Sequence, residues 1–320
     1  MTVAAVMTTY NPSQKTVANA ARIRPQVDAL IVVDDAGDTG DEVLATLEAA
    51  GAIVLRQPTN GGIGAALNRG VNLALSIDAK FILTFDQDST IADDYVASLI
   101  DAYDAGRKHG AIGFVAPEFF GSVRQGFESK QHSDLLVTQN VIQSGMLIPA
   151  ETFRSAGLFD ESLFIDLVDY EYELRIRALN LLGIAAPGIT FVHELGTLYE
   201  RRLFGFRLSL PGLGSTTTYS TPFRYYYRVR NRLVINRRYK RHERSTIRRD
   251  TSIDFIHFLF ALQTARPRRT LWRVMRAGWK AARKNEMGRM PAALMKEAQT
   301  TRWSAPRVVS STESSPQTSH

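Results

Sequence analysis

The sequence predicts an α/β fold with a mostly parallel central sheet, followed by a basic helical C-terminal region. Short apolar segments alternate with helical segments through the first 115 residues, a rhythm typical of parallel strands joined by helices. The charge also changes sign along the chain. Residues 1–200 hold 13 Lys and Arg against 26 Asp and Glu, whereas residues 201–320 hold 26 against 6. Such a split indicates two regions with different partners.

Four apolar segments of the first region read as strands, and a helical segment follows each one. The strands are expected at 3–10, 29–37, 52–57 and 80–88, and the helices at 13–23, 41–51, 63–77 and 92–106. The strands end in polar or flexible stretches, "TTYNP", "DDAGD", "TNGG" and "DQDST". Right-handed crossovers place these ends at one edge of the sheet. Open α/β sheets bind their ligands at that edge, so we expect a binding cleft there.

The later part of the chain is less regular. Strands are expected within "NVIQSGMLIP" and "GIAAPGITFVHELG", and helices at 222–243, 250–265 and 268–285. We therefore divide the chain into an α/β domain with the expected cleft at 1–205, a basic helical region at 206–303 and a disordered tail at 304–320, which is rich in Ser, Thr and Pro.

Composition excludes several classes of protein. The chain has no cysteine, which excludes disulfides, thiol catalysis and cysteine-bound zinc. The N-terminus lacks a basic leader and reads as a first strand instead of a signal peptide. The longest strongly apolar run, "FIHFLFAL", is too short to span a bilayer. We expect a soluble or peripheral cytoplasmic protein.

Two carboxylates follow the fourth expected strand, in "FILTFDQDST". Asp86 and Asp88 point the same way in an extended segment and repel each other unless a cation lies beside them. Divalent cations with oxygen ligands meet that need, and a cation at this edge could neutralise a departing diphosphate. A lone D-x-D is about as often a pair of helix-capping acids as a metal site. The polar ends of the neighbouring strands favour the metal hypothesis.

Two other enzyme classes use similar motifs. In haloacid-dehalogenase-type phosphatases, Asp86 would be a nucleophile and Asp88 a general acid, but here three strand-helix units precede the motif. "NGGIGAAL" contains the G-x-G of dinucleotide-binding domains, but Leu67 replaces the third glycine and the motif follows the third strand. The alternative for that loop is a tight turn whose following helix presents N–H groups to an anion.

The order of the segments resembles that of inverting family 2 glycosyltransferases with the GT-A fold. These segments are "TTYNP", "VVDDAG", "NGGIGAALNRG", "DQDS", "SGMLI", "FDESLFIDLVDYEYELRIR" and "VHELG", within roughly residues 1–240. "DQDS", "FIDLVDYEYELRIR" and "HELG" most resemble bacterial rhamnosyltransferases. The resemblance implies transfer of L-rhamnose from dTDP-L-rhamnose to a glycan or lipid-linked acceptor in cell-surface polysaccharide synthesis. It also implies Mg²⁺ or Mn²⁺. A UDP- or GDP-sugar donor stays open.

The resemblance also assigns roles to individual residues. Tyr10 would stack on the base, Asp35 would accept the pyrimidine N3–H, and Asp88 would bind the metal that holds the diphosphate. The other implied donor-site residues are Thr8, Asn11, Asn60, Gly62, Asn68, Asp86 (ribose or metal), His193 (metal or diphosphate), Arg230 and Asn231.

Three carboxylates, Asp166, Asp169 and Glu171, crowd the expected start of a helix in "DLVDYEYELRIR". Acids stabilise a helix N-terminus, which is one explanation. The other is a general base that deprotonates the acceptor hydroxyl. By the resemblance Asp169 is that base, although Val168 replaces the glutamate that usually precedes it. Glu171 is the reserve candidate.

The C-terminal region combines cations with apolar helical stripes. Phe255, Phe258, Leu259 and Leu262 form one stripe, and Leu271, Met275 and Trp279 form another among many Lys and Arg. A basic amphipathic helix with tryptophan suits an anionic membrane surface, here the inner face of the cell membrane. The stripes also allow a homo-oligomer. No nucleic-acid-binding module is recognisable. A non-catalytic membrane or nucleic-acid adaptor with a degenerate cleft is the remaining alternative to an enzyme.

Overall fold

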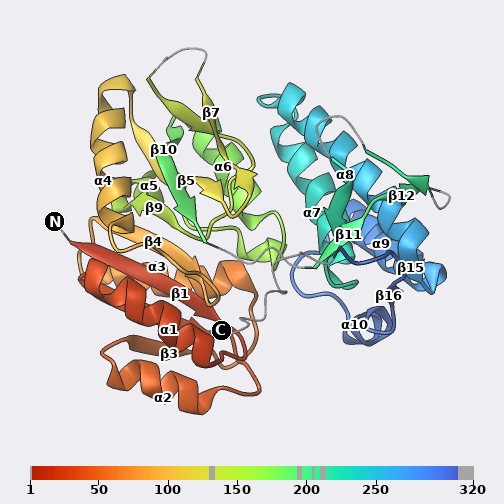
Figure 1. Ribbon diagram of the computed structural model, residues 1–320, viewed down its shortest axis with the longest axis horizontal. Helices are drawn as coiled ribbons and strands as arrows, with labels where there is room; N and C mark the ends of the chain where they lie inside the picture. The colour runs from red at the N-terminus through yellow and green to blue at the C-terminus, as the bar shows by residue number, and fades with distance from the viewer. Residues whose placement is uncertain (1, 130–133, 193–196, 204–205, 210–213, 309–320) are drawn as a thin grey trace, which may run out of the picture. The chain divides into compact units, whose positions relative to one another are not determined.

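The computed structural model describes residues 2–129, 134–192, 197–203, 206–209 and 214–308 (Figure 1). The chain divides into two compact units. Unit 1 comprises residues 1–194, 234–243 and 285–289, and unit 2 comprises residues 195–233, 244–284 and 290–320. The chain therefore crosses between the units more than once, whereas the sequence analysis placed a single boundary after residue 205.

The first half of unit 1 has the predicted alternation of strands and helices. Strands β3, β2, β1 and β4 lie side by side in that order, and all are parallel. The strands are β1 (Val3–Thr9), β2 (Ala29–Asp34), β3 (Ile53–Arg56) and β4 (Phe81–Asp86). The helices are α1 (Gln14–Ile23), α2 (Asp41–Ala49), α3 (Ile63–Ser76) and α4 (Tyr95–Gly106).

The second half of the sheet is mixed. β9 pairs antiparallel with both β4 and β5, and β10 is parallel to β5. The segment 140–149 yields a strand only at its end, and the residues before that strand form a loop beside β4. The further elements are β5 (Ile112–Phe120), β6 (Val123–Arg124), β7 (Gly126–Glu128), β8 (Leu136–Thr138), β9 (Met146–Pro149), α5 (Ala150–Ala156), α6 (Val168–Ala178) and β10 (Leu182–Phe191).

Helices cover both faces of this sheet, which explains why its central strands are apolar on both faces. Met7 and Leu83 belong to the core that packs under α1, α2 and α4. Val6 and Ile82, one residue earlier on the same strands, belong to the core under α3 and α6. The alternation buries every residue of β1 and holds the carboxyl ends of four strands at one edge.

Unit 2 is largely helical, and its three main helices lie close to the ranges expected from the sequence. α7 (Arg224–Tyr239) begins in unit 2 and ends in unit 1, while α8 (Arg244–Thr264) and α9 (Arg268–Lys284) belong to unit 2. The remaining elements are α10 (Ala292–Ala298), β11 (Leu198–Glu200), β12 (Arg202–Leu203), β13 (Phe206–Arg207), β14 (Thr216–Thr218), β15 (Ala265–Arg266) and β16 (Arg302–Trp303).

The predicted tail starts within the described part of unit 2. The Ser304 N–H donates to the Thr264 carbonyl at 2.9 Å, and the Val308 N–H donates to the Leu198 carbonyl at 2.8 Å. Residues 304–308 therefore pack on unit 2, and residues 309–320 lie outside the described range.

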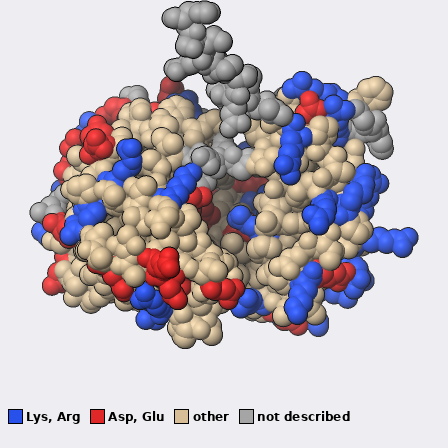
Figure 2. Space-filling model, turned by 60° about the horizontal axis from the view of Figure 1, so that its bottom comes forward, with Lys and Arg blue, Asp and Glu red and all other residues tan. Residues whose placement is uncertain are grey.

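Two members of the predicted α9 stripe, Leu271 and Met275, face the interior of unit 2, whereas the third, Trp279, is exposed. Leu271 is fully buried and Met275 is 8% exposed. Gly278 lies against the Tyr226 backbone, where a Cβ atom would stand 2.3 Å from the carbonyl oxygen. The exposed face instead carries Trp272 and Trp279 among cations. Figure 2 shows Lys and Arg side chains spread over unit 2.

In the part of the chain that the structure describes, none of the helices has both the length and the apolar character that a membrane span requires.

Candidate functional site

The end of β1 is tied to the end of β4. The Tyr10 N–H donates to Gln87 Oε1 at 2.9 Å, and Thr8 pairs with Asp86 across the two strands. The Tyr10 ring is 47% exposed. Asn11, at φ +51°, accepts a hydrogen bond from the Thr39 N–H at 3.0 Å. The exposed ring thus lies at the sheet edge on a fixed backbone, as base stacking requires.

Asp35, just after β2, holds the loop between β3 and α3. Its Oδ1 accepts hydrogen bonds from Gln57 Nε2 and the Gly61 N–H, both at 2.8 Å, and its Oδ2 accepts from the Gly62 N–H at 3.0 Å. Burial raises the pKa of Asp35, and these hydrogen bonds oppose that shift. Since a carboxylate offers about four acceptor positions, the three bonds leave room for one more donor.

Gly62 is required by a close approach of the protein backbone. Its φ is +86°, and a Cβ atom there would lie 2.2 Å from the Phe164 carbonyl oxygen. That oxygen also accepts the Ile63 N–H at 2.9 Å. Three non-glycine residues in the segment that follows α5, Phe164, Asp166 and Leu167, have positive φ. Such strained segments often occur at functional sites, and this one leads directly into Asp169.

Asn60 and Asn68 of the predicted donor site differ in their surroundings. Asn68 is buried, and its amide nitrogen donates to the Phe159 carbonyl and to Glu161 Oε1, while its oxygen accepts the Phe159 N–H. It therefore positions the 159–161 segment against α3. Asn60 Oδ1 is buried and accepts no hydrogen bond within the described structure. An acceptor of this kind at the sheet edge suits a ligand N–H or hydroxyl.

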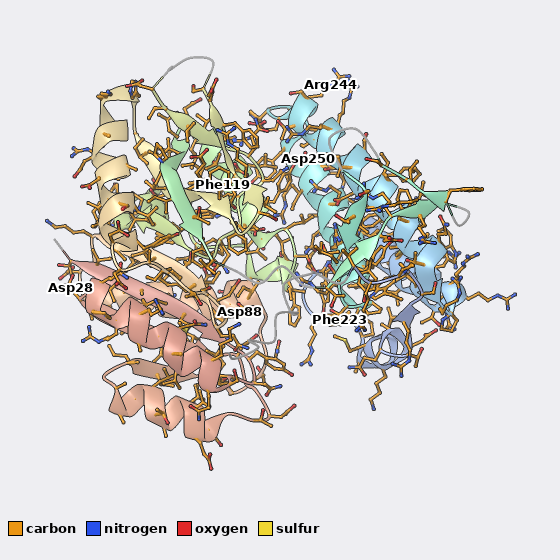
Figure 3. The ribbon with its side chains drawn as sticks, in the orientation of Figure 1. Asp28, Asp88, Phe119, Phe223, Arg244 and Asp250 are labelled. Atoms are coloured by element: carbon orange, nitrogen blue, oxygen red, sulfur yellow. The ribbon has the colours of Figure 1, made fainter. Side chains whose placement is uncertain are left out.

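Asp86, the last residue of β4, contacts a residue that the sequence analysis did not single out. Gln143 Nε2 donates to Asp86 Oδ1 at 2.7 Å, and the Asp86 N–H donates to Ser144 Oγ at 2.9 Å. Since a carboxylate only accepts hydrogen bonds, the Gln143 amide nitrogen must face it. Gln143 Oε1 therefore points away, buried and without a partner in the described residues. Asp88 is exposed near the end of the same strand (Figure 3).

The donor atoms around Asp86 and Asp88 fit a hard divalent cation. Within the described ranges no three Asp, Glu or His side chains cluster as a metal site, and the predicted ligand His193 lies outside those ranges. Mg²⁺ is usually bound by one or two carboxylates together with substrate phosphates. Asp86 and Asp88 would supply the protein's carboxylates at such a site.

Asp169 lies in the first turn of α6 and is partly buried. Desolvation by burial raises its pKa to about 6. Hydrogen bonds from the backbone amides of Tyr170 and Gln143 lower the pKa, and the nearby Asp166 charge raises it further. Gln143 thus contacts both predicted functional carboxylates. Its side-chain amide donates to Asp86, and its backbone N–H donates to Asp169. A carboxylate with a pKa near neutrality is suited to act as a general base.

The other acids of α6 are in structural ion pairs. Glu171 is 2% exposed, pairs with Arg175 and accepts the Tyr239 hydroxyl at 2.6 Å. Glu173 pairs with Arg177 at 2.7 Å. Because Arg175 and Tyr239 hold the Glu171 carboxylate, it has no role as a base here, and Asp169 is the better candidate.

Comparisons with known proteins agree with this geometry. The family model described as glycosyl transferase family 2 matches residues 4–159. The dTDP-rhamnosyl transferase RfbF of Shigella flexneri is 30% identical in an alignment over 255 residues, which covers 73% of this chain and 79% of RfbF. The chain belongs to glycosyltransferase family 2. Unit 1 carries the GT-A fold of this family, and the protein is a glycosyltransferase.

Solved structures that match this chain include those of TarS from S. aureus. The crystal structure of TarS 1-349 gives a TM-score of 0.44 at 14% identity, covering 73% of this chain and 65% of that chain. The complex of TarS 1-349 with UDP-GlcNAc gives 0.49 at 14% identity, covering 73% and 66%. This chain therefore spans slightly less than two thirds of those TarS chains.

Family membership decides between the hypotheses drawn from "FILTFDQDST" and "NGGIGAAL". As a family 2 glycosyltransferase, the chain is neither a haloacid-dehalogenase-type phosphatase nor a non-catalytic adaptor. In the structure three strands precede β4 along the chain, and the glycine loop follows β3, where Asp35 holds it. The loop therefore forms part of the sheet edge of a glycosyltransferase.

The remaining predicted residues lie in unit 2. Arg230 and Asn231 are both fully buried, and Arg230 Nε donates to Asn231 Oδ1 at 3.0 Å. The Arg230 guanidinium lies over the rings of Tyr226 and Tyr227, 5.4 and 5.1 Å from their centroids. In this structure the pair stabilises α7 inside unit 2.

Sequence reasoning missed Gln143 and Phe164. Gln143 lies in "NVIQSGMLIP", a segment whose apolar pattern predicts only a strand. A polar pair, Gln143 and Ser144, ahead of a fully apolar strand is the signal that could have indicated a loop with a role at the site. Phe164 acts through its carbonyl, and no side-chain pattern reveals that contact.

Proposed function

We propose that this family 2 glycosyltransferase transfers L-rhamnose from dTDP-L-rhamnose with inversion and uses Asp169 as the general base. The observation that supports the mechanism is the Asp169 carboxylate, whose pKa of about 6 suits proton abstraction near neutral pH. The donor is inferred from the 30% identity to the dTDP-rhamnosyl transferase of Shigella flexneri across most of both chains.

The reaction is a single displacement. Asp169 takes the proton of an acceptor hydroxyl while that oxygen forms a bond to the anomeric carbon of the sugar. The bond between this carbon and the phosphate oxygen breaks, and dTDP leaves with the bonding electrons. Attack from the face opposite the leaving group inverts the anomeric configuration. A positioned general base of this kind typically increases the reaction rate by a factor of about 10²–10⁴.

Residues at the strand ends would hold the nucleotide. The exposed Tyr10 ring stacks on the base, and Asp35 accepts the pyrimidine N3–H at its remaining acceptor position. The unpartnered Asn60 Oδ1 accepts a hydrogen bond from the ribose or the base. Thr8, Asn11, Gly62 and Asn68 shape the edge through backbone and loop contacts.

Asp86 and Asp88 would bind Mg²⁺ or Mn²⁺, with Gln143 orienting Asp86. When bound, the cation supplies charge neutralisation to the leaving diphosphate. His193 is a further ligand candidate from the sequence. Asp88 carries the direct bond to the metal in this proposal, because its exposed carboxylate follows the strand end.

The proposed acceptor is a lipid-linked glycan at an anionic membrane surface. The exposed face of α9 holds Trp272 and Trp279, which are 56% and 41% exposed, and α9 contains no acidic residue. The Arg283 guanidinium lies 4.8 Å from the Trp279 ring centroid. Each Lys or Arg near an anionic membrane surface contributes about 1 kcal/mol to the free energy of membrane binding. A dimer that buries the tryptophans is the alternative use of this face.

Vesicle binding separates these two uses. The protein should sediment with vesicles containing anionic lipid, less at high salt, and replacing both tryptophans with alanine should reduce binding by about tenfold. Sedimentation equally well with neutral vesicles, or a monomer-to-dimer shift that the same variant abolishes, would contradict the membrane proposal.

Calorimetric titration tests the donor. We expect dTDP to bind more tightly than UDP or GDP in the presence of Mn²⁺, and EDTA to weaken that binding. The titration is followed by turnover of dTDP-L-rhamnose. Preference for UDP or GDP would keep the family assignment and overturn the rhamnose donor.

A further inference from the structure

Gln57, the first residue after β3, has hydrogen-bonding groups that no part of the described structure uses. Its backbone N–H donates to the Asp34 carbonyl at 2.9 Å, beside the last paired residues of β2 and β3. Its partly exposed side chain makes one described hydrogen bond, from Nε2 to Asp35 Oδ1 at 2.8 Å. Since an amide side chain offers two N–H donors and a carbonyl acceptor, one N–H and the carbonyl have no partner among the described residues.

The carboxylate of Asp35 fixes the orientation of this amide. Because a carboxylate only accepts hydrogen bonds, the nitrogen of Gln57 and not its oxygen must face Asp35. Asp35 Oδ1 also accepts the Gly61 N–H, and Oδ2 accepts the Gly62 N–H. With about two acceptor positions on each oxygen, Oδ1 is filled and Oδ2 keeps one position. The sheet edge therefore presents an acceptor on Asp35 next to a donor on Gln57.

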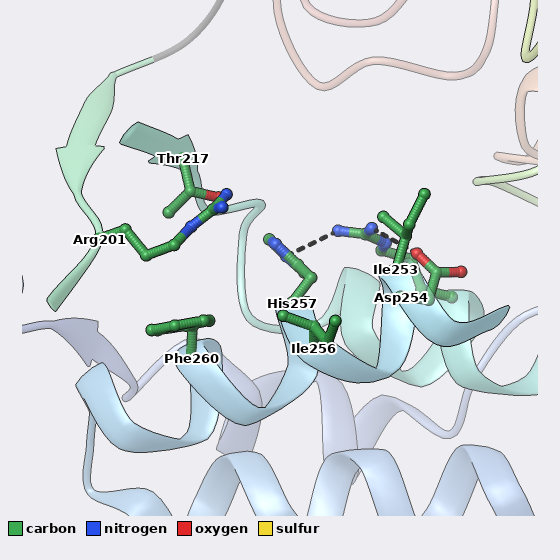
Figure 4. Close-up of a pocket in the computed structure, with 8 residues that line it drawn as sticks. Arg201, Thr217, Ile253, Asp254, Ile256, His257 and Phe260 are labelled. Atoms are coloured by element: carbon green, nitrogen blue, oxygen red, sulfur yellow. Dashed lines mark hydrogen bonds and ion pairs between the residues drawn. The ribbon is translucent and has the colours of Figure 1, made fainter. Parts of the chain in front are cut away.

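An acid of unit 2 shows how a carboxylate loses this capacity. Asp254 lines a cavity of about 200 Å³ (Figure 4) and pairs with Arg228 at 3.1 Å and with Arg232 at 2.7 Å. These guanidinium groups compensate its charge. The described partners of Asp35 are all neutral, so its charge remains available to one more N–H. Hydrogen bonds with a charged acceptor are about twice as strong as neutral ones.

Among the pyrimidine bases, thymine and uracil match this neighbouring acceptor and donor. In both bases the N3–H lies between two carbonyl groups, so a donor has an acceptor on either side. Asp35 would accept the N3–H, and the unused N–H of Gln57 would then face one of the flanking carbonyls. Cytosine does not match, because its N3 is an acceptor and an amino group replaces the carbonyl at C4.

We propose that Gln57 selects thymine and uracil nucleotides by donating its second side-chain N–H to a carbonyl group beside N3–H of the base. The inference rests on the proposed function, because it requires a pyrimidine nucleotide at Asp35. Selection follows because a cytosine nucleotide would place its N3 lone pair against the Asp35 carboxylate and leave polar groups of the site without partners, which costs more than a missing contact.

Titration calorimetry of the full chain in Mn²⁺ tests the proposal without turnover, with UDP, CDP, 2-thio-UDP and 4-thio-UDP as probes. Sulfur accepts hydrogen bonds more weakly than oxygen, so each thio-analogue weakens the hydrogen bond to one carbonyl position only. The test variant is Gln57→Leu, which removes the amide, and Gln57→Met is a second variant that keeps the length of the side chain. The control is Gln299→Leu, which changes an exposed glutamine of unit 2.

We expect wild type to bind UDP about 100-fold more tightly than CDP, and about fivefold more tightly than one of the two thio-analogues. Gln57→Leu and Gln57→Met should bind UDP about tenfold more weakly than wild type does. They should also bind UDP and that thio-analogue equally, because the hydrogen bond that sulfur weakens is already absent. Gln299→Leu should match wild type in every titration.

A thio-analogue penalty of equal size in wild type and the Gln57 variants would mean that Gln57 only orients Asp35, and would overturn the contact with the base. The contact is equally overturned if wild type binds UDP and both thio-analogues alike, or if the Gln57 variants keep the wild-type affinity for UDP. These results leave the proposed donor intact. A wild type that binds CDP more tightly than UDP, or binds neither, would contradict the inference and the proposed function together.

Discussion

The charged side chains of unit 1 and unit 2 differ in the partners that hold them. At the sheet edge of unit 1, neutral donors hold the carboxylates: Gln143 binds Asp86, and Gln57 with two backbone amides binds Asp35. In unit 2 the charges are guanidinium groups, and one carboxylate, Asp254, serves two of them. Neutral groups thus hold these carboxylates of unit 1, whereas cations hold the Asp254 carboxylate of unit 2.

This difference in partners determines whether a carboxylate can still attract a cation. Amides and N–H groups stabilise a carboxylate without cancelling its charge, so a cation can still be attracted to it. Ion pairs inside α6, between Glu171 and Arg175 and between Glu173 and Arg177, show the opposite arrangement, in which the charge is cancelled and the role is structural. The identity of the hydrogen-bond donor therefore distinguishes Asp35 and Asp86, the acids proposed to be functional, from the acids of α6 that are held in ion pairs.

The largest predicted effect is on catalysis by Asp169. Asp169→Asn should lower kcat by about 10³ and leave dTDP binding unchanged, because the base acts on the acceptor hydroxyl and not on the nucleotide. Single-turnover release of dTDP and calorimetry measure the two quantities. The control is Glu151→Gln, which changes an acid with an 80% exposed side chain. Full transfer by Asp169→Asn would remove this residue from the mechanism.

Asp88→Asn should have the next largest effect. It should weaken dTDP binding in Mn²⁺ by about 100-fold and leave binding in EDTA unchanged, because the lost carboxylate would act only through the metal. Calorimetry with and without EDTA measures both values. An equal loss in the two conditions would mean that Asp88 contacts the nucleotide directly.

A smaller effect is expected for Gln143. Gln143→Leu removes the donor to Asp86 and should lower kcat/KM about tenfold. Gln143→Glu should lower it more, because a second carboxylate would face Asp86. Initial rates with dTDP-L-rhamnose compare the two. If Gln143→Glu were the more active variant, the proposed orientation of the amide would be wrong.

The smallest predicted effect is on stability and depends on pH. Because the pKa of Asp169 is raised in the folded state, its ionised form destabilises that state. The destabilisation develops as the pH rises from the pKa that Asp169 has in the unfolded chain to its folded pKa of about 6. Asp169→Asn should therefore increase the free energy of unfolding by about 1–2 kcal/mol at pH 8, after allowance for solvent exposure, and change it little at pH 4. Urea unfolding at both pH values checks this. A variant less stable than wild type at pH 8 would identify Asp169 as a structural acid.

The sequence predicted the first half of the sheet because its strands and helices are regular. Apolar runs such as that of β4, followed by helices, report both the strand positions and the edge at which Asp86 and Asp35 lie. The second half could not be read in the same way, since β9 is short, antiparallel and preceded by a loop that has no periodic pattern.

The details of the site depend on contacts between distant segments. Gln143 meets Asp86 across 57 residues of sequence, and Phe164 meets Gly62 through its carbonyl. The pattern of α9 shows that the helix has two faces, but not which one packs inward. Leu271 and Met275 are buried because they fill unit 2, and the tryptophans remain outside.

The most direct test of the account is the pH dependence of kcat/KM for dTDP release from dTDP-L-rhamnose, measured from about pH 4.5 to 8.5. If Asp169 is the base, activity should rise through an acid limb with a pKa of about 6, because only the ionised carboxylate accepts a proton. An acid limb near 4, or a flat profile, would contradict a desolvated Asp169 as the catalytic base.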